Sequence, residues 1–500
     1  VGDKRPAWQL ALASARLPLY DVHWTPAIVV EKPPSKAWRV GLADGRIVPF
    51  AVNNGEAQRK LGLYDVVLVN LVEGKSKAAA RADLRVRPTV QGMVVVLENK
   101  TGRILAMTGG FSYPLSQLNR ATQAQRQPGS TIKPLSYLAA LGNGLQPNTL
   151  VQDEPISLPS GARGEYWTPK NYGGESGGTM TMRRALENSR NLATVHLLDG
   201  GIEKKPEASL DRVCDLAVEA QIYKECDHYY SVVLGAQPVR AVDLAAFYAS
   251  IANEGLHPSP HVIDAIDRNG LTVYRYDPNS TIAIKSVDHA AFYQLKTMLQ
   301  GVLARGTARS LAGISPYVAG KTGTSQDEND AWFVGFTNDV TVAVWMGYDN
   351  ADGKRRTLGG GVTGGGVAVP IFEQVIQAAW ANGVPKVPLA PPSAEAKRLL
   401  SCSGEKTNVE CLRIDARGRV IDTQYRLVSR ESSYASRRDR DDDDDRPKRR
   451  RARSSDDGER SATRTYEQRS YDRGWSNEPS RGGSQWGWQP WGNNSSSGRW

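Results

Sequence analysis

The sequence has few of the residues from which metal sites and serine–histidine catalytic sites are usually built. Among 500 residues there are six histidines and four cysteines. The cysteines include no C-x-x-C pair and no histidine lies directly beside them, so a zinc site is not expected. No Ser-His-Asp pattern is evident either, and only His196 lies close to a motif discussed below. We expect no metal and no cofactor.

The four cysteines fall into two local pairs, Cys214 with Cys226 and Cys402 with Cys411. These spacings are compatible with two short-loop disulfides, which would fit an oxidising compartment, and equally with four reduced thiols. The sequence leaves both possibilities open.

Long apolar runs are also missing. No stretch is long enough to span a bilayer, and the chain does not begin with the charged and apolar regions of a signal peptide. A cytosolic protein is one interpretation. The chain begins at Val1, and we favour a fragment whose N-terminal anchor is missing.

The charge is concentrated at the C-terminal end. The net charge of +10 would suggest nucleic acid, an anionic membrane surface or an acidic polymer as a partner. Much of the arginine, however, follows Ser429, where an acidic block at 441–445 precedes a basic block at 446–451. This end has too little apolar surface to offset its ordering entropy, so residues 431–500 are predicted to form a disordered tail.

The rest of the chain divides into regions with different patterns. Residues 1–30 are interpreted as an interdomain linker. Residues 31–90 favour short strands, with an Asp44-Gly45 hairpin turn, and indicate either a small β-rich domain of oligonucleotide/oligosaccharide-binding (OB) type or a simple β spacer. A catalytic domain is predicted over 91–384, and a C-terminal extension, opening with a proline-rich linker, over 385–430.

The catalytic region alternates strands with helices. Hairpins are predicted at 92–107 and at 331–345, and mostly helical patterns lie between them. An antiparallel sheet with a cluster of helices packed on it is an α+β fold.

Three short motifs follow one another along the catalytic region. Ser130 to Lys133 is S-x-x-K, Ser189 to Asn191 is S-x-N, and Lys321 to Thr324 is K-T-G-T. An S-x-x-K is expected by chance about twice in a chain of this length, and Ser403 to Lys406 is another. The order of all three motifs is typical of serine enzymes that open amides through an acyl-enzyme.

Ser130 is the candidate nucleophile and Lys133 its candidate base. A serine hydroxyl needs a base, and a lysine serves if burial or neighbouring cations lower its pKa. At the start of a helix the two side chains would share one face, within hydrogen-bonding range. Pro128 and Gly129 suit such a start, where Ser130 taken alone would be an ordinary N-cap.

The other motifs supply candidate partners. Ser189 could pass a proton to a leaving amine and Asn191 could bind a substrate carbonyl, although this triplet alone would indicate a capping turn. The K-T-G-T segment is predicted to be a strand. Lys321 would give a fixed positive charge, Thr322 and Thr324 hydroxyls for a carboxylate, and Gly323 room for an extended peptide.

From about Trp24 to Trp380 the chain resembles the transpeptidase region of class A penicillin-binding proteins of the 1A type, which are penicilloyl-serine transferases. Beyond the three motifs, the similar segments are 126–130, 167–172, 234–248, 301–308 and 330–335. The class A glycosyltransferase motif E-D-x-x-F-x-x-H-x-G is missing. We therefore interpret the chain as the C-terminal part of a bifunctional protein.

The resemblance implies a mechanism and a location. Ser130 would be acylated by the penultimate D-alanine of a peptidoglycan stem peptide, with Lys133 as base. Ser189 and Asn191 would assist, and Lys321, Thr322 and Gly323 would help to bind the substrate. The backbone N–H groups of Ser130 and Thr324 would form the oxyanion hole. β-Lactams would acylate Ser130, on the periplasmic face of the inner membrane.

Alternative functions stay open. In a D,D-carboxypeptidase or a β-lactamase, water would take the acyl group, although neither Glu165 nor Glu187 is clearly a deacylating base. A non-catalytic β-lactam sensor or wall-binding scaffold could keep Ser130 without turnover. The basic tail with Trp488 and Trp491 suggests nucleic acid. Outside the cytoplasm that partner is not expected. The tail could then meet cell-wall or envelope partners, or be a solvated tether with no partner.

Overall fold

The computed structural model describes residues 5–15, 17, 23–72, 80–160, 164–277, 280–350, 353–405, 407–423 and 427–428, the last two for their backbone only. Chain contacts separate a unit Val1–Ala435 from a unit Ser436–Trp500, and all the described residues belong to the first. The tail predicted over 431–500 lies outside the described residues. No helix in the described part is both long and apolar enough to cross a membrane.

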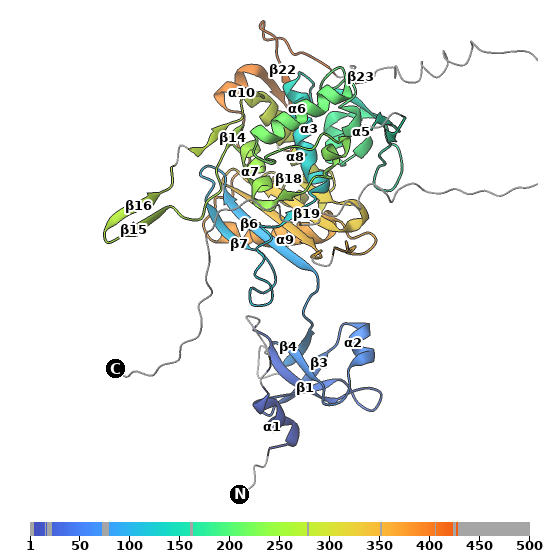
Figure 1. Ribbon diagram of the computed structural model, residues 1–500, viewed down its shortest axis with the longest axis vertical. Helices are drawn as coiled ribbons and strands as arrows, with labels where there is room; N and C mark the ends of the chain where they lie inside the picture. Colours follow the sequence, from blue (N-terminus) through green and yellow to red (C-terminus); the bar gives the residue numbers. More distant parts are fainter. Residues whose placement is uncertain are drawn as a thin grey trace, which may run out of the picture. The chain divides into compact units, whose positions relative to one another are not determined.

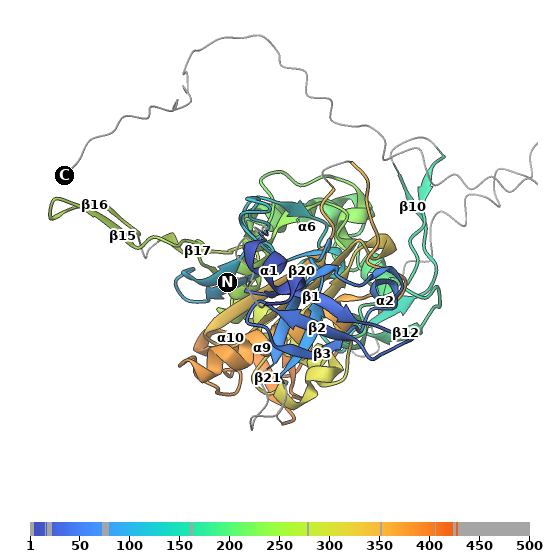
Figure 2. The same ribbon diagram turned by 90° about the horizontal axis from the view of Figure 1, so that it is seen from below.

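The N-terminal part of the unit contains a closed five-stranded barrel. Its strands are β1 (Thr25–Glu31), β2 (Arg39–Leu42), β3 (Ile47–Ala51), β4 (Val66–Val72) and β5 (Arg81–Arg85), in the order β1-β2-β3-β5-β4. Only β3 and β5 pair in parallel, and α2 (Gly55–Lys60) connects β3 to β4. Figure 2 shows β1, β2 and β3 side by side. The inward side chains of Val29, Val40, Val69 and Ala82 are fully buried.

The barrel begins earlier than the sequence indicated. Residues 1–30 were expected to be a linker, but they contain α1 (Ala7–Ser14) and most of β1. Strand β1 pairs with both β2 and β4 and therefore closes the barrel. The hairpin at Asp44-Gly45 forms as expected, with Gly45 at φ 91°, a conformation that favours glycine.

A five-stranded sheet forms the centre of the catalytic region (Figure 1). Its order is β18 (Ala319–Thr324), β19 (Asp330–Phe336), β20 (Val340–Gly347), β6 (Gln91–Glu98) and β7 (Ile104–Thr108), and every neighbouring pair is antiparallel. Both predicted hairpins are present. The later hairpin (β19–β20) pairs with the earlier one (β6–β7) through β20 and β6. Strand β18, which carries K-T-G-T, therefore lies at one edge of the sheet.

Helices cover both faces of this sheet. Phe333 on β19 packs against Phe372 of α9 (Gly364–Ala381), and Phe336 on the same strand packs against Tyr248 of α7 (Ala241–Ala252). Residues three apart on a strand point to opposite faces, so α9 and α7 lie on opposite sides. Helices α3 (Lys133–Gly142) and α8 (His289–Ala304) join α7 on its side (Figure 1). The arrangement is a mixed α and β fold with an antiparallel sheet, as predicted.

The remaining helices and short strands surround this core. The helices are α4 (Met182–Glu187), α5 (Asn191–His196), α6 (Pro206–Glu219), α10 (Ala394–Leu399), η1 (Gly129–Ile132), η2 (Tyr230–Leu234), η4 (Arg309–Ile314) and η5 (Gln326–Glu328). The strands are β8 (Gln125–Arg126), β9 (Leu150–Asp153), β10 (Leu158–Pro159), β11 (Tyr166–Trp167), β12 (Gly178–Thr181), β13 (Val239–Arg240), β14 (Leu256–His257), β15 (Ala265–Arg268), β16 (Leu271–Arg275), β17 (Ile282–Ala283), β21 (Leu400–Ser403), β22 (Glu410–Arg413) and β23 (Leu427–Val428).

The C-terminal extension packs on the catalytic region. Its first residues were interpreted as a linker, yet the N–H of Leu389 donates to the Pro316 carbonyl at 3.0 Å. Arg413 pairs with Asp288 at 2.7 Å. The extension therefore belongs to the same compact unit through backbone bonds and ion pairs that composition does not reveal.

Both cysteine pairs are joined as disulfides, Cys214–Cys226 and Cys402–Cys411. Of the two states that the sequence left open, the structure has the oxidised one. The second disulfide links β21 to β22 and lies within the extension.

Candidate active site

The candidate nucleophile lies in a short helical turn. Ser130 is half-buried in the 3-10 helix η1, and Lys133 is the first residue of α3. Pro134 falls within the first turn of α3, where a missing N–H costs nothing. The Tyr248 hydroxyl donates to the Thr131 carbonyl at 2.7 Å and so ties η1 to α7. These contacts fix the direction of the turn that carries Ser130.

Glycines bring this turn against the K-T-G-T strand. A Cβ on Gly129 would lie 2.5 Å from the carbonyl oxygen of Thr324, and one on Gly323 would lie 2.6 Å from the carbonyl oxygen of Pro128. Both distances are shorter than any side chain tolerates. Gly235, at φ 87°, in turn packs on Gly129. Only glycine at these positions lets Ser130 and Thr324 lie on touching segments of backbone.

Lys133 is fully buried and turns toward the S-x-N motif. Its Nζ donates to the Ser189 carbonyl and to Asn191 Oδ1, both at 2.6 Å, and lies 3.4 Å from Ser189 Oγ. The expected hydrogen bond from Lys133 to Ser130 is not among those of the described residues. Burial, and next the charge of Lys321, hold the pKa of Lys133 well below its usual range. The lower pKa raises the share of the unprotonated amine, which is the form that can accept a proton.

Ser189 occupies a position that usually requires glycine. It follows α4 at φ 57°, and the N–H groups of Ser189 and Arg190 donate to the carbonyls of Leu186 and Ala185. This is the Schellman end of a helix, whose left-handed residue is normally glycine. A serine there costs about 1 kcal/mol of backbone strain. In this conformation the Ser189 carbonyl faces the Lys133 amine.

The side chains of the K-T-G-T residues on β18 point alternately to the two faces of the sheet. Lys321 and Gly323 point to the face that meets η1, and Lys321 is fully buried with its Nζ 3.0 Å from the Thr322 carbonyl. Burial lowers the pKa of Lys321 to about 7. Lys321 was expected to carry a fixed positive charge. At neutral pH it is only partly protonated, because burial disfavours the charged form.

The two threonines point to the other face. Thr322 Oγ1 lies 2.6 Å from Thr307 Oγ1, and Thr324 Oγ1 accepts the Gly364 N–H at 3.1 Å. That bond leaves the Thr324 hydroxyl proton free to donate. Thr307 received no role from the sequence, although it lies in one of the segments that carried the resemblance.

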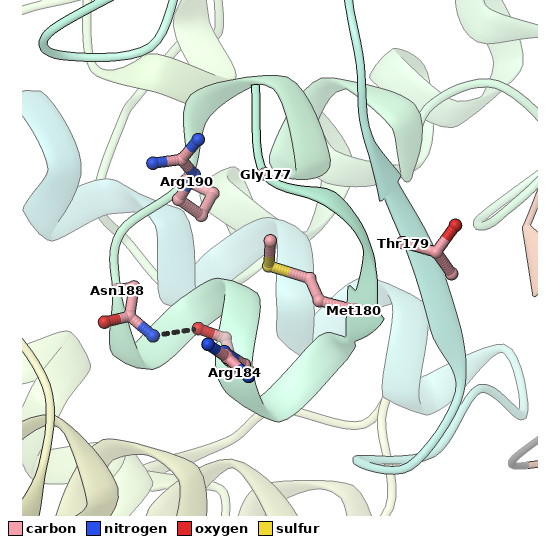
Figure 3. Close-up of a pocket in the computed structure, with 6 residues that line it drawn as sticks. All are labelled: Gly177, Thr179, Met180, Arg184, Asn188 and Arg190. Carbon is pink, nitrogen blue, oxygen red and sulfur yellow. Dashed lines mark hydrogen bonds between the residues drawn. The ribbon is translucent and has the colours of Figure 1, made fainter. Parts of the chain in front are cut away.

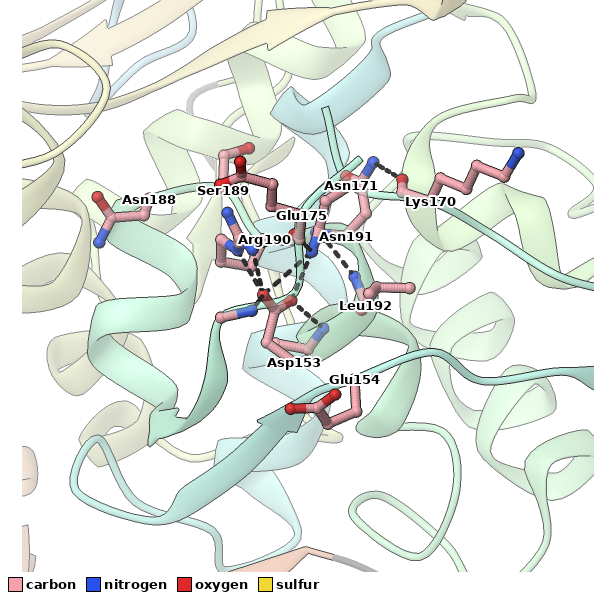
Figure 4. Close-up of polar contacts among 12 residues, drawn as sticks. Asp153, Glu154, Lys170, Asn171, Glu175, Asn188, Ser189, Arg190, Asn191 and Leu192 are labelled. Atoms are coloured by element: carbon pink, nitrogen blue, oxygen red, sulfur yellow. Dashed lines mark hydrogen bonds and ion pairs between the residues drawn. The ribbon is translucent and has the colours of Figure 1, made fainter. Parts of the chain in front are cut away.

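A buried carboxylate lies behind the S-x-N turn (Figure 4). Asp153, at the end of β9, is fully buried and pairs with Arg190 at 2.5 Å. The Asn171 amide donates to both of its carboxylate oxygens at 3.0 Å. The sequence assigned no role to any of these three residues, because the contacts join segments that are far apart in the chain.

A pocket of about 330 Å³ opens beside the same turn (Figure 3). Its lining residues are Gly177, Thr179, Met180, Arg184, Asn188 and Arg190. Ser130, Lys133, Ser189, Asn191 and Lys321 are not among these lining residues, although Asn188 and Arg190 flank Ser189.

The competing residues named from the sequence have other contacts. His196 is buried, lies 3.1 Å from the Glu154 carbonyl, and has a pKa lowered mainly by burial. Glu187 bonds Arg305 through both carboxylate oxygens, and the side chain of Glu165 is exposed. Ser403 lies on strand β21 and not at a helix start, and its motif partner Lys406 is outside the described residues.

Comparison with known proteins gives a consistent assignment. The model of the penicillin-binding protein transpeptidase domain matches residues 92–210 and 234–377, together more than half of the chain. Penicillin-binding protein 1A of Rickettsia bellii is 36% identical over 410 residues, covering 76% of this chain and 50% of that protein. The protein of the same name from Neisseria gonorrhoeae is 35% identical over 367 residues, covering 69% of this chain and 44% of that protein.

Solved structures agree on the fold. The crystal structure of penicillin-binding protein 1A from Haemophilus influenzae aligns with a TM-score of 0.66 at 21% identity, covering 83% of this chain and 65% of that one. This likeness concerns the fold of the chain. The chain belongs to the penicillin-binding protein transpeptidase domain family. It spans about half the length of the curated relatives it matches.

Proposed function

We propose that this chain is a serine D,D-transpeptidase that cross-links peptidoglycan stem peptides and is inhibited by β-lactams. One observation carries the proposal. The Lys133 amine contacts Ser189 and Asn191, while the turn that holds Ser130 touches the K-T-G-T strand through Gly129 and Gly323. Three motifs far apart in the sequence are therefore brought together, two at the Lys133 amine and the third against the turn that holds Ser130.

The contacts of Lys133 support its role as general base. A neutral lysine amine has two N–H groups and one lone pair. The Ser189 carbonyl and Asn191 Oδ1 can only accept, so at 2.6 Å each they take both N–H groups. The lone pair is then left to accept a hydroxyl proton. Ser189 Oγ lies 3.4 Å from Lys133 Nζ, and in the proposed step the proton comes from Ser130. Ser130 Oγ attacks the carbonyl of the penultimate D-alanine as that proton moves to Lys133.

The other motif residues complete the reaction. The N–H groups of Ser130 and Thr324 stabilise the oxyanion. The terminal D-alanine leaves as an amine that receives its proton by way of Ser189. An amine of a neighbouring stem then attacks the acyl-enzyme, forms the cross-link and releases Ser130. The hydroxyls of Thr322 and Thr324 bind the substrate carboxylate, Lys321 adds its partial charge from the opposite face of the strand, and Gly323 leaves room for the substrate backbone.

Hydrolysis of the acyl-enzyme is the second candidate outcome. A carboxypeptidase or β-lactamase needs a base for water, but Glu187 is held by Arg305 and Glu165 is exposed. These positions favour transfer to an amine. Release of product also separates an enzyme from a β-lactam sensor or scaffold.

Mass spectrometry of the intact chain with labelled penicillin tests the proposal. We expect one adduct, mapped to Ser130, with a lifetime of hours, and release of D-alanine from a stem-peptide analogue. An adduct on Ser403 would contradict the assignment of the nucleophile. Rapid loss of the adduct would instead indicate a β-lactamase.

The location and remaining partners follow from this function. Stem peptides lie outside the cytoplasm, and the two disulfides suit an oxidising compartment. We propose that the chain acts at the periplasmic face of the inner membrane, as part of a longer anchored protein, with envelope partners for its tail. The strand order of the barrel supports an OB-type fold.

A further inference from the structure

The helix that carries Asn191 begins without a local cap. The side chain of Arg190, which precedes α5, caps none of its N–H groups. Asn171 instead accepts from the N–H groups of Asn191 and Leu192 with its Oδ1, at 2.7 and 3.2 Å. A second remote residue, Asp153, accepts from the next N–H, that of Ala193, at 3.2 Å. The start of α5 is therefore fixed by two side chains from other segments.

The Asp153 carboxylate connects these segments. Its Oδ1 accepts from Ala193 and its Oδ2 from the Gly177 N–H at 2.8 Å, while the Asn171 amide bonds both oxygens. Arg190 Nε donates to Oδ2 at 2.6 Å. A fully buried carboxylate with this many donors is held rigidly, and it fixes the residue between Ser189 and Asn191 (Figure 4).

Arg190, the middle residue of the S-x-N motif, is thus fixed by hydrogen bonds, as Ser189 and Asn191 are. The Arg190 guanidinium also donates to the Glu175 carbonyl at 2.6 Å. The Asn191 amide donates to the Lys170 carbonyl at 2.7 Å, which turns its Oδ1 toward Lys133. A shift in this turn would move both acceptors of the Lys133 amine.

We propose that Asp153, Asn171 and Arg190 form a positioning unit that holds the Ser189–Asn191 turn against Lys133. The inference rests on the proposed function, because it assigns these residues to the base of that reaction. None of them touches the reacting atoms, and they act through the turn.

The unit acts on Lys133 through charge as well as through position. The charged groups acting on Lys133 are Lys321 on β18, Asp153 on β9 and Arg190 in the turn. Beyond burial, Lys321 and Arg190 lower the pKa of Lys133, and Asp153 raises it. Burial lowers the pKa of His196, on α5, whose ring lies 3.1 Å from the Glu154 carbonyl. Removing Asp153 or Arg190 should therefore shift the Lys133 pKa in opposite directions.

The test is the pH dependence of acylation of the full chain by penicillin, for Asp153→Asn and Arg190→Gln. The rate rises with pH as Lys133 loses its proton. Asp153→Asn removes a charge that favours the protonated amine, so the rise should move to lower pH. Arg190→Gln removes a positive charge that disfavours the protonated amine, so the rise in rate should move to higher pH. Both maximal rates should fall, by a factor on the order of 10 to 100, because the turn is misplaced.

Two variants serve as controls. Asp288 also pairs with an arginine, Arg413, and caps a helix N–H, that of Ala291. Asp288→Asn should leave the pH profile unmoved. Arg190→Lys restores the charge without the paired hydrogen bonds, so its profile should return to the wild-type position while its maximal rate stays low. Thermal melting checks that each variant is folded.

The outcomes are distinct. Shifts of Asp153→Asn and Arg190→Gln in the same direction, or folded variants with unmoved profiles, would overturn the inference. Should Asp153→Asn not fold, Arg190→Gln must still shift the profile upward and Arg190→Lys must not; any other pattern overturns it. A wild-type chain that takes no adduct on Ser130 would refute the proposed function first, and the inference with it.

Discussion

The two sides of the candidate site are built by different means. On the strand side, Gly129 and Gly323 let backbone touch backbone, with hypothetical Cβ contacts of 2.5 and 2.6 Å. On the turn side, Ser189 and Asn191 are held by hydrogen bonds and by the buried ion pair of Asp153 with Arg190. The strand side should therefore be sensitive to added volume, and the turn side to changes of charge and hydrogen bonding.

Lys133 belongs to both sides, and replacing it should have the largest effect. Lys133→Ala removes the proposed base while leaving the glycine contacts and the Asp153 network in place. We expect acylation by penicillin to fall at least about a hundredfold, with the fold retained, as measured by adduct formation and thermal melting. Near-normal acylation would mean that another residue is the base, with His196 the first to examine.

Added volume tests the strand side. Gly323→Ala places a methyl group against the Pro128 carbonyl, so the η1 turn that carries Ser130 must move away from the strand. Overpacking of this kind costs about 1–3 kcal/mol, and acylation should fall with it. Gly313→Ala is the matched control: no atom lies within 4 Å of its added Cβ, and its stability should change by less than about 0.5 kcal/mol. Equal effects of the two substitutions would contradict the close approach.

Replacing Thr322 or Lys321 tests whether the K-T-G-T strand recognises the substrate carboxylate. Thr322→Ala removes the hydroxyl that lies 2.6 Å from Thr307 Oγ1, and Lys321→Ala removes the partial charge. Both should slow acylation by substrates with a free carboxylate, on the order of tenfold for a lost charge-assisted hydrogen bond. The loss should be smaller for amidated substrates. Equal losses on both substrate types would show that these residues are structural.

The sequence predicted the strand side better than the turn side. Lys321 to Thr324 and Ser130 to Lys133 are contiguous patterns whose spacing on a strand or helix fixes how their side chains point. Asp153 and Asn171 act through tertiary contacts across loops. Asn171 lies in the segment 167–172, which carried the resemblance, but no local pattern assigns either residue to the S-x-N turn. The buried state of Lys321, which lowers its pKa, likewise depends on what packs over β18. The position of Ser189 in a left-handed turn depends on how α4 ends.

Ser189 allows the smallest and sharpest test, because here stability and activity should move apart. At φ 57° the serine is strained, and glycine tolerates this conformation at no steric cost. Ser189→Gly should therefore raise the free energy of unfolding by about 0.5–1 kcal/mol, while Ser189→Ala should not. Both substitutions remove the hydroxyl and keep the carbonyl that binds Lys133. Both should therefore slow release of the leaving amine to a similar extent, which turnover of a stem-peptide analogue measures. A stability gain for alanine as well, or no gain for glycine, would show that the left-handed turn stores no strain. Unchanged turnover in both would remove the Ser189 hydroxyl from the proton path, and the contribution of the turn would then rest on its carbonyl and on Asn191.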